Sequence, residues 1–181
     1  MTSYHAFLGC SLDGFIAGPR GELDWLIPFD EKLGDYGYDE FFASIDAMAM
    51  GRASYEAIRT SNPEYYRDTP VHVLSGTLPP GPMPAMGRSA VTVHSGIREL
   101  REALASAGTG RVYVDGGRTV QAFLSAELLS DIVITRVPVL IGEGIPLFGP
   151  VPAPVHAELV DSRVLGAGAV QSVYRFPTDK G

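Results

Sequence analysis

The sequence predicts a single α/β domain over residues 1–181, in three layers. We expect a mostly parallel mixed sheet with helices on both faces and an antiparallel hairpin at the C-terminal end of the chain. Short apolar runs alternate with helix-competent segments through the middle of the sequence, which favours parallel strands joined by helices. Two of these runs end in glycine and lead directly into a helix. The segments 157–165 and 169–176 flank Gly166-Ala167-Gly168, which is typical of a hairpin.

The first third of the chain predicts a strand, an apolar loop and a helix. Residues 5–11 form an apolar run that ends before Asp13-Gly14. Residues 38–45 have helical spacing and lead into a strand at 47–50, after which a helix is expected at 54–59. The loop after the first strand holds more large apolar residues than a solvated connection needs, so some are expected to face a ligand: Phe15, Ile16, Leu23, Trp25 and Leu26.

The middle of the chain continues the alternation. Strands are expected at 71–75 and 90–95, a helix from residue 97 to Gly108 or Gly110, a strand at 112–115 and a helix at 120–129. The proline-rich stretch 79–84 predicts a loop, and Met86-Gly87-Arg88 is interpreted as part of it because no strand is expected before it. A long strand is expected at 131–140, with Pro138 marking a bulge or an edge.

The two strand–glycine–helix junctions predict anion sites. One is Met50-Gly51-Arg52 and the other is Asp115-Gly116-Gly117-Arg118. A helix N-terminus presents free N–H groups at the positive end of its dipole, and glycine lets a phosphate approach the backbone. Either junction alone is common in α/β proteins, but two together suit a dinucleotide diphosphate.

The arginines beside these junctions favour a phosphorylated cofactor. Arg52 and Arg118 each follow the glycine of a junction, and a guanidinium binds a 2′-phosphate better than a bare ribose. The sequence therefore predicts NADPH. Neither junction matches G-x-G-x-x-G or the phosphate loop G-x-x-x-x-G-K-[ST], which disfavours the two commonest nucleotide-binding folds.

Composition excludes several other classes. A net charge of -7 without any Lys/Arg cluster argues against nucleic acid as a partner. Cys10 is the only cysteine, so no internal disulfide is possible, and the N-terminus lacks a signal-peptide pattern. No apolar run could span a bilayer, so no membrane is expected as a partner and the cytoplasm is the expected location. The histidines lack metal-ligand spacing, and no metal is expected.

Four segments resemble the dihydrofolate reductase-like superfamily. They are Ser11-Leu12-Asp13-Gly14-Phe15-Ile16-Ala17, Leu23-Asp24-Trp25-Leu26, Met50-Gly51-Arg52-Ala53-Ser54-Tyr55-Glu56 and Gly116-Gly117-Arg118. Within the superfamily the chain is most similar to the C-terminal reductase domain of the bifunctional riboflavin-biosynthesis deaminase/reductase. The zinc deaminase motif of that bifunctional enzyme is absent from this sequence.

This resemblance implies a set of site residues. The Gly116–Gly117 bond would be the cis peptide of the family, Ser75 would lie beside the 2′-phosphate, and Trp25 would cover the substrate pocket, unless it is ordinary loop packing. The riboflavin-type group pairs as dimers, so a homodimer is an expectation. The implied cofactor-binding residues are Leu12, Ile16, Ala17, Gly51, Arg52, Ser54, Ser75, Gly116, Gly117, Arg118 and Thr119.

A carboxylate is expected to serve the reaction. Dihydrofolate reductases place an acid under the pterin, and Asp30 follows Trp25 at a similar spacing. Asp35 and Asp39 are alternatives in the same loop. Asp13 is a further catalytic candidate, because its place in the riboflavin-type pattern would let it face the substrate.

These observations predict an NADPH-dependent reductase that acts on a C=N or C=O group of a small pterin-like or pyrimidine-like molecule. The reaction needs the nicotinamide close to the acceptor and a source of one proton. Two alternatives remain open at this stage. One is a true dihydrofolate reductase, and the other is an NADPH-binding protein without turnover.

Overall fold

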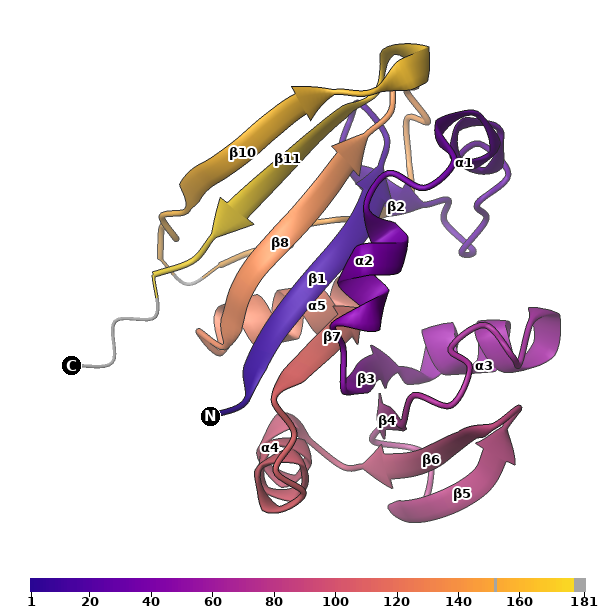
Figure 1. The fold of residues 1–181 in the computed structure, drawn as a ribbon, viewed down its shortest axis with the longest axis vertical. Helices are drawn as coiled ribbons and strands as arrows, with labels where there is room; N and C mark the ends of the chain where they lie inside the picture. The colour runs from indigo at the N-terminus through magenta and orange to yellow at the C-terminus, as the bar shows by residue number, and fades with distance from the viewer. Residues whose placement is uncertain (152, 178–181) are drawn as a thin grey trace.

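A computed structural model describes residues 1–151 and 153–177. Its main feature is a nine-stranded sheet in the order β10-β11-β8-β1-β7-β3-β4-β6-β5 (Figure 1). Strands β8, β1, β7, β3, β4 and β6 are parallel, and β10, β11 and β5 are antiparallel to their neighbours. The predicted mostly parallel mixed sheet with an antiparallel C-terminal hairpin is confirmed.

Most strands of this sheet coincide with apolar runs of the sequence. Their bounds are β1 Ser3–Cys10, β3 Ala47–Gly51, β4 Val71–Leu74, β5 Gly81–Met86, β6 Ser89–His94, β7 Arg111–Asp115, β8 Leu129–Arg136, β10 Glu158–Val164 and β11 Val170–Arg175. A separate two-stranded antiparallel sheet pairs β2 Phe15–Ala17 with β9 Ile145–Pro146. A short 3-10 turn, η1 Gly166–Gly168, joins the two strands of the hairpin.

Helices cover both faces of the sheet, so the three-layer arrangement is confirmed. The helices are α1 Ile27–Leu33, α2 Tyr38–Ala43, α3 Arg52–Ser61, α4 Ile97–Ser106 and α5 Gly117–Ser125. One core holds the apolar side chains of α4 and α5, such as Leu104 and Phe123, against β1, β7 and β8. The other core packs Phe42 of α2 and Tyr55 of α3 against the opposite face. Figure 1 shows α2 in front of the sheet and α5 behind it.

The structure corrects three expectations. Residues 81–84 of the proline-rich stretch are not a loop, because they belong to β5, which pairs with β6, and Gly87-Arg88 forms the hairpin turn between the two strands. An edge strand tolerates proline since its missing N–H would face solvent. The strand after Asp131 ends at Arg136, so Pro138 lies outside it. Residues 27–33, which carry no strong helical period, form α1 with Pro28 in its first turn.

Within the part of the chain that the structure describes, no helix has the length and apolar character that crossing a membrane requires.

Candidate cofactor and substrate site

Two helix N-termini meet at the carboxyl ends of neighbouring strands. β3 and β7 are adjacent and parallel, with Met50 opposite Asp115. Helix α3 starts directly after Gly51, and helix α5 starts directly after Gly116. The register therefore brings the two junctions singled out in the sequence to one edge of the sheet, where ligands of open α/β sheets bind.

The glycines of the two junctions allow the helices to interlock. A Cβ built at Gly116 would lie 2.6 Å from the Ser54 Oγ of α3, and one built at Gly51 would lie 3.1 Å from the Thr119 Oγ1 of α5. Gly116 also has a φ of +88°, which L side chains rarely adopt. Each helix thus contributes a hydroxyl beside the glycine of the other junction. The result is a small polar cradle in which a Cβ would clash at Gly116 and would be tightly confined at Gly51.

Both N-termini carry free backbone donors. Neither α3 nor α5 has a side-chain cap, and neither has an acid in its first turn. The first N–H groups of a helix lack intrahelical partners, so an uncapped pair of helices without an acid in either first turn favours an anion. Arg52 and Arg118 occupy the first turns and remain exposed. This arrangement fits a diphosphate, and the assignment of a dinucleotide cofactor depends on it.

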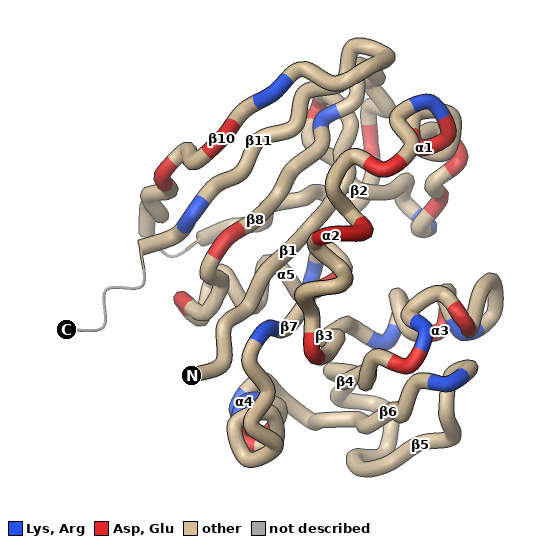
Figure 2. Tube along the Cα trace, in the orientation of Figure 1, with Lys and Arg blue, Asp and Glu red and all other residues tan. Residues whose placement is uncertain are grey.

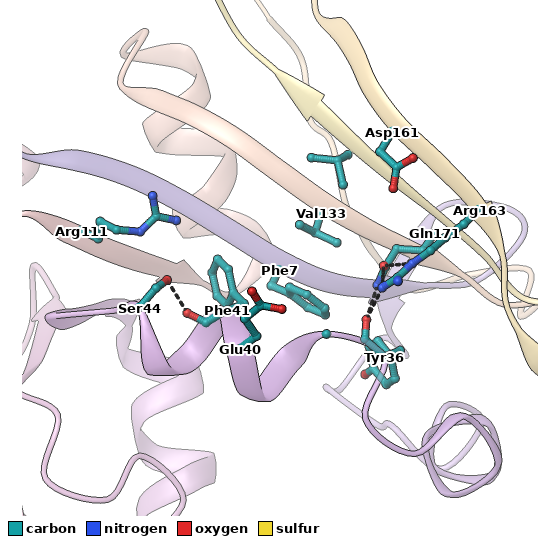
Figure 3. A pocket seen from close by; sticks show the side chains of 12 residues that line it. Phe7, Tyr36, Glu40, Phe41, Ser44, Arg111, Val133, Asp161, Arg163 and Gln171 are labelled. Carbon is teal, nitrogen blue, oxygen red and sulfur yellow. Dashed lines mark hydrogen bonds between the residues drawn. The ribbon is translucent and has the colours of Figure 1, made fainter.

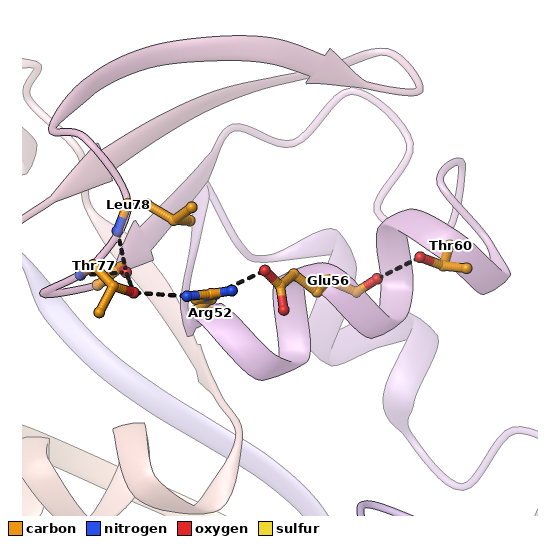
Figure 4. A network of polar contacts seen from close by, with 6 residues as sticks. Arg52, Glu56, Thr60, Thr77 and Leu78 are labelled. Carbon is orange, nitrogen blue, oxygen red and sulfur yellow. Dashed lines mark hydrogen bonds and ion pairs between the residues drawn. The ribbon is translucent and has the colours of Figure 1, made fainter.

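Arg52 belongs to a polar network at the end of β4. Its Nε lies 2.7 Å from Glu56 Oε1 on the same helix, and its Nη1 donates to Thr77 Oγ1 at 2.8 Å (Figure 4). Ser75 Oγ accepts the backbone N–H groups of Thr77 and Leu78 at 3.2 and 3.0 Å. The structure brings the predicted partners Arg52 and Ser75 together through Thr77, a residue that the sequence analysis missed.

Asp115 is the carboxylate nearest to the cradle along the chain, because Gly116 follows it directly. It is partly buried at the end of β7, and its Oδ2 accepts the phenolic O–H of Tyr66 at 3.1 Å. Burial raises the pKa of Asp115 above its ordinary value, while the hydrogen bonds from Tyr66 and the Gly116 backbone act in the opposite direction. An acid in this state can hold and release a proton. Asp115 is not among the acids that the sequence pattern predicts for catalysis.

The two-stranded sheet β2/β9 forms a wall next to the α5 junction. A Cβ built at Gly117 would lie 2.7 Å from Ile16 Cδ1 and 3.2 Å from the Pro146 carbonyl oxygen. Gln121 Nε2 on α5 donates to the same carbonyl at 2.8 Å. Ile16, which the resemblance assigns to the cofactor, therefore lies against the predicted glycine pair. Ala17 is buried in β2, one position further along the strand.

Asp13 fastens the loops that carry this wall. Its Oδ2 accepts the backbone N–H of Gly142 at 2.8 Å, and its Oδ1 accepts Ser11 Oγ at 2.6 Å and the Ile141 N–H at 3.3 Å. The hydrogen bond from Ser11, followed by those from the backbone, lowers the pKa of Asp13. Both carboxylate oxygens are engaged within the protein. This geometry suits a residue that positions the β1–β2 and β8–β9 connections.

The three aspartates predicted from the loop, Asp30, Asp35 and Asp39, are exposed at the protein surface. Asp30 is exposed on α1, and its Oδ1 accepts the phenolic O–H of Tyr36 at 2.9 Å. Asp35 Oδ1 accepts the N–H groups of Gly37 and Asp39 at the start of α2. Asp39 is exposed and lies 3.9 Å from Arg67. None of the hydrogen bonds described for these acids joins them to the cradle.

Two further predicted residues precede or follow β2. Leu12 is 55% exposed, and its backbone N–H donates to the Val139 carbonyl at 2.7 Å. Trp25 is partly buried on the turn before α1, and its Nε1 is buried without a hydrogen-bond partner among the described residues. A buried indole N–H normally has a partner, so Trp25 is unusual in this respect.

The predicted cis peptide between Gly116 and Gly117 is wrong for this structure. No peptide bond among the described residues is cis. Gly116 has φ 88° and ψ 136°, a combination open to glycine, and this backbone makes the turn into α5 with a trans bond.

A separate open groove of about 500 Å³ runs along α2 (Figure 3). Phe7 and Val133 line it from the sheet, and Arg111 and Arg163 extend into it. Arg163 Nη2 donates to the Tyr36 carbonyl at 2.7 Å and to Gln171 Oε1 at 2.6 Å, which fastens the C-terminal hairpin to the connection before α2. The groove does not include any residue of the glycine cradle.

No metal centre is evident in residues 1–151 and 153–177, because these ranges contain no group of three or more His, Cys, Asp or Glu side chains that could hold an ion.

The fold and the paired junctions define the class of protein: this is a dihydrofolate reductase-like fold of the riboflavin-biosynthesis reductase type. The model of the RibD C-terminal domain family matches residues 5–171, and the chain belongs to that family. Two relatives from Bacillus subtilis are named as uncharacterized proteins. YwjB is 31% identical over 144 residues, which is 78% of this chain and 80% of the relative, and YyaP is 27% identical over 177 residues, or 93% and 92%.

Solved structures agree with this membership. A putative riboflavin biosynthesis protein from Shewanella sp. PV-4 aligns with a TM-score of 0.83 at 29% identity, covering 97% of this chain and 99% of that one. A deaminase/5-amino-6-(5-phosphoribosylamino)uracil reductase from Thermotoga maritima aligns with a TM-score of 0.71 at 14% identity. The alignment covers 97% of this chain but 57% of the Thermotoga protein, and at this identity it shows the shared fold. The chain is thus reductase-like in fold and family.

Proposed function

We propose that this protein is an NADPH-dependent reductase that transfers a hydride to a C=N or C=O group of a small pyrimidine-like molecule. The single observation that carries the proposal is the interlocked pair of uncapped helix N-termini with Gly51 and Gly116 at their base. The named activity of the Thermotoga protein is the source of the substrate class.

The cradle supports the dinucleotide part of the proposal. The N–H groups at the starts of α3 and α5 would hold the diphosphate, with Ser54 and Thr119 as further donors. Ile16 and the β2/β9 wall would border the nicotinamide side, because they lie against Gly117. When bound, the cofactor supplies the hydride.

The network around Arg52 supports NADPH over NADH. Its guanidinium is oriented by Glu56 and Thr77 before any ligand binds, so little side-chain entropy is lost on binding a 2′-phosphate. A charge-assisted hydrogen bond contributes about 1.5–3 kcal/mol, or roughly tenfold to a hundredfold in affinity.

Asp115 supplies the proton that hydride transfer requires. A hydride added to the carbon of C=N or C=O leaves negative charge on the nitrogen or oxygen, which must then gain a proton. The raised pKa of Asp115 favours its protonated form, and the O–H of Tyr66 holds the carboxyl in place. We therefore assign proton donation to Asp115 rather than to Asp30.

Calorimetric titration with NADPH and NADH tests the cofactor assignment. We expect the wild-type protein to bind NADPH tenfold to a hundredfold more tightly, and Arg52→Ala to remove most of that difference while NADH affinity stays nearly constant. Arg59→Ala is the matched control, because Arg59 lies on the same helix and contacts the Tyr55 ring instead. Equal affinities for NADPH and NADH in the wild-type protein would contradict the proposal.

A further inference from the structure

Strand β10 is an exposed edge of the main sheet. It has β11 on one side, and the structure describes no strand on its other side (Figure 1). All seven residues of β10 are exposed. Three of them are apolar: Leu159, Val160 and Val164 are 55%, 46% and 80% exposed. An edge with free backbone N–H and C=O groups and exposed apolar side chains is a template for pairing with another strand.

The two edges of the sheet differ in how they resist such pairing. β5, at the opposite edge, contains Pro82 and Pro84, which lack a backbone N–H. β10 contains neither proline nor lysine, the residues that commonly protect an edge strand. A register shift lies between Leu159 and Asp161, and residues 161–164 pair regularly with β11 after it. β10 is therefore the edge at which a further strand can be added.

The backbone of β10 directs hydrogen-bonding groups away from the sheet at Ser162 and Val164. The Leu165 N–H donates to the Ala169 carbonyl at 2.8 Å, so residue 165 faces β11. The direction of these groups alternates along an antiparallel strand. The N–H and C=O groups of Arg163 therefore also point to β11, whereas those of Ser162 and Val164 point outward. An added strand would bond to these outward groups.

The charges of β10 are complementary to those of a second, antiparallel copy of the same strand. Asp161 and Arg163 lie two positions apart and share one face, where both line the groove along α2 (Figure 3). Figure 2 shows acidic and basic positions following one another along β10. A two-fold axis at Ser162 would place Asp161 of each copy opposite Arg163 of the other. Opposite charges facing each other across two strands are favourable, and like charges are unfavourable.

Arg163 is already oriented for such a contact. Its Nε donates to Gln171 Oε1 at 2.9 Å, and its Nη2 donates to the same oxygen at 2.6 Å and to the Tyr36 carbonyl at 2.7 Å. The hydrogen bonds that the structure describes for this side chain leave Nη1 available. Because the guanidinium is held in place, little side-chain entropy would be lost when a carboxylate binds to it.

We infer that two copies of this chain pair through β10, antiparallel and with a two-fold axis at Ser162, so that their sheets join into one. Ser162 then lies opposite Ser162 of the other copy, and their outward backbone groups bond reciprocally. In the same register Val160 lies opposite Val164, so exposed apolar side chains meet. A two-fold interface must be self-complementary. The order apolar, acid, serine, base, apolar over residues 160–164 meets this requirement, which favours a second copy over a foreign strand.

Sedimentation velocity on the full chain, from low micromolar concentration to a hundredfold above it, tests the inference. We expect a concentration-dependent dimer. Asp161→Arg and Arg163→Asp would each create two like-charge contacts across the axis, so each should raise the dimer dissociation constant at least about tenfold. Glu102→Arg, which makes the same charge change at an exposed position on α4, is the matched control and should leave that constant unchanged.

The charge swap Asp161→Arg/Arg163→Asp should restore dimerisation to nearly the wild-type level. The double variant still lacks the hydrogen bonds from Arg163 to Tyr36 and Gln171, so its recovery cannot come from repair of the hairpin within one chain. NADPH affinity should be unchanged in Asp161→Arg, because β11, β8 and β1 separate β10 from the strands of the cradle. Failure of the wild-type protein to bind NADPH would count against the proposed function and not against this interface.

Cross-linking tests the register. Two Ser162→Cys chains should be joined by a short bismaleimide, because residue 162 lies at the axis. Ala85→Cys, at an exposed position on the β5 edge, should stay uncross-linked, and the native Cys10 is buried. The inference would be overturned by a monomer at every concentration, which would leave the edge to a strand of another protein. A dimer that ignores the charge variants, or that Ser162→Cys does not cross-link, would also overturn it.

Discussion

Replacing Asp115 with asparagine should separate catalysis from stability. Asparagine keeps an oxygen that can accept the Tyr66 hydroxyl, whose distance to Asp115 Oδ2 is 3.1 Å, but it cannot donate an acidic proton. A hydrogen bond to a charged group contributes about 1.5–3 kcal/mol, so we expect kcat/KM to fall by roughly tenfold to a hundredfold or more. NADPH affinity should change little, because the cradle donors are untouched.

The same substitution should not destabilise the protein at neutral pH. Burial raises the pKa of Asp115 above the ordinary value of 3.8, so the folded state favours the protonated acid and the ionised form is disfavoured. As pH rises from the ordinary pKa through the raised one, the wild-type protein loses stability that Asp115→Asn keeps. Each unit of such a shift corresponds to about 1.36 kcal/mol, and each kcal/mol to about 2–4 °C in Tm at this chain length.

Thermal melts across acidic to neutral pH, together with steady-state kinetics, measure both effects. The Tm advantage of Asp115→Asn should grow with pH and then level off. Asp68→Asn, which changes an exposed acid, is the matched control. A variant that melts at lower temperature at every pH, yet turns over normally, would show that Asp115 is a structural residue and would refute the assignment.

Three further predictions concern the backbone and the titrating groups. Gly116→Ala should abolish NADPH binding and lower Tm by several degrees in thermal melts. A φ of +88° is strained for alanine by about 1–3 kcal/mol, and the alanine Cβ would clash with Ser54 Oγ. Normal NADPH binding by a folded variant would contradict this prediction. Asp13→Ala should raise the NADPH Kd and speed amide exchange at Gly142 with little change in Tm, and unchanged exchange would exclude its positioning role. Burial, with His94 nearby, lowers the pKa of His72 to about 4, so the stability of the folded protein should fall as pH drops from 6.5 towards 4. Thermal melts across this pH range should show a smaller loss of stability for His72→Gln. An identical pH profile for the variant and the wild-type protein would show that His72 is not the source of the loss.

Much of the fold could be predicted because local pattern and tertiary environment agree. The alternation of apolar runs with helical segments predicted the parallel strands, and Gly166-Ala167-Gly168 predicted the hairpin. The misplaced elements are those in which context overrides local preference. β5 contains Pro82 and Pro84 and follows Pro79-Pro80, and it tolerates these prolines because it lies at the edge of the sheet. Helix α1 is short and has no buried residue, so no helical spacing of apolar residues predicts it.

The two strand–glycine–helix junctions could be predicted from the sequence for a different reason. Glycine at the end of an apolar strand constrains the backbone locally, so Gly51 and Gly116 could be found without knowledge of what lies opposite them. Their interlocking with Thr119 and Ser54 depends on the adjacency of β3 and β7, which no local pattern specifies.

Spacing along the chain did not predict which acid lies beside the proposed cofactor site. Asp30 follows Trp25 at a spacing that resembles the dihydrofolate reductase loop, but α1 begins at Ile27 and Asp30 is exposed on it. An acid on a surface helix can move with that helix, and its environment differs little from water. Asp115 is joined by a peptide bond to Gly116, so its backbone belongs to the junction that would bind the diphosphate, and the hydrogen bond from Tyr66 holds its carboxyl. A proton donor must lie close to the atom it serves, and this position beside the junction, with the hydrogen bond from Tyr66, is the physical reason to expect the chemistry at the end of β7.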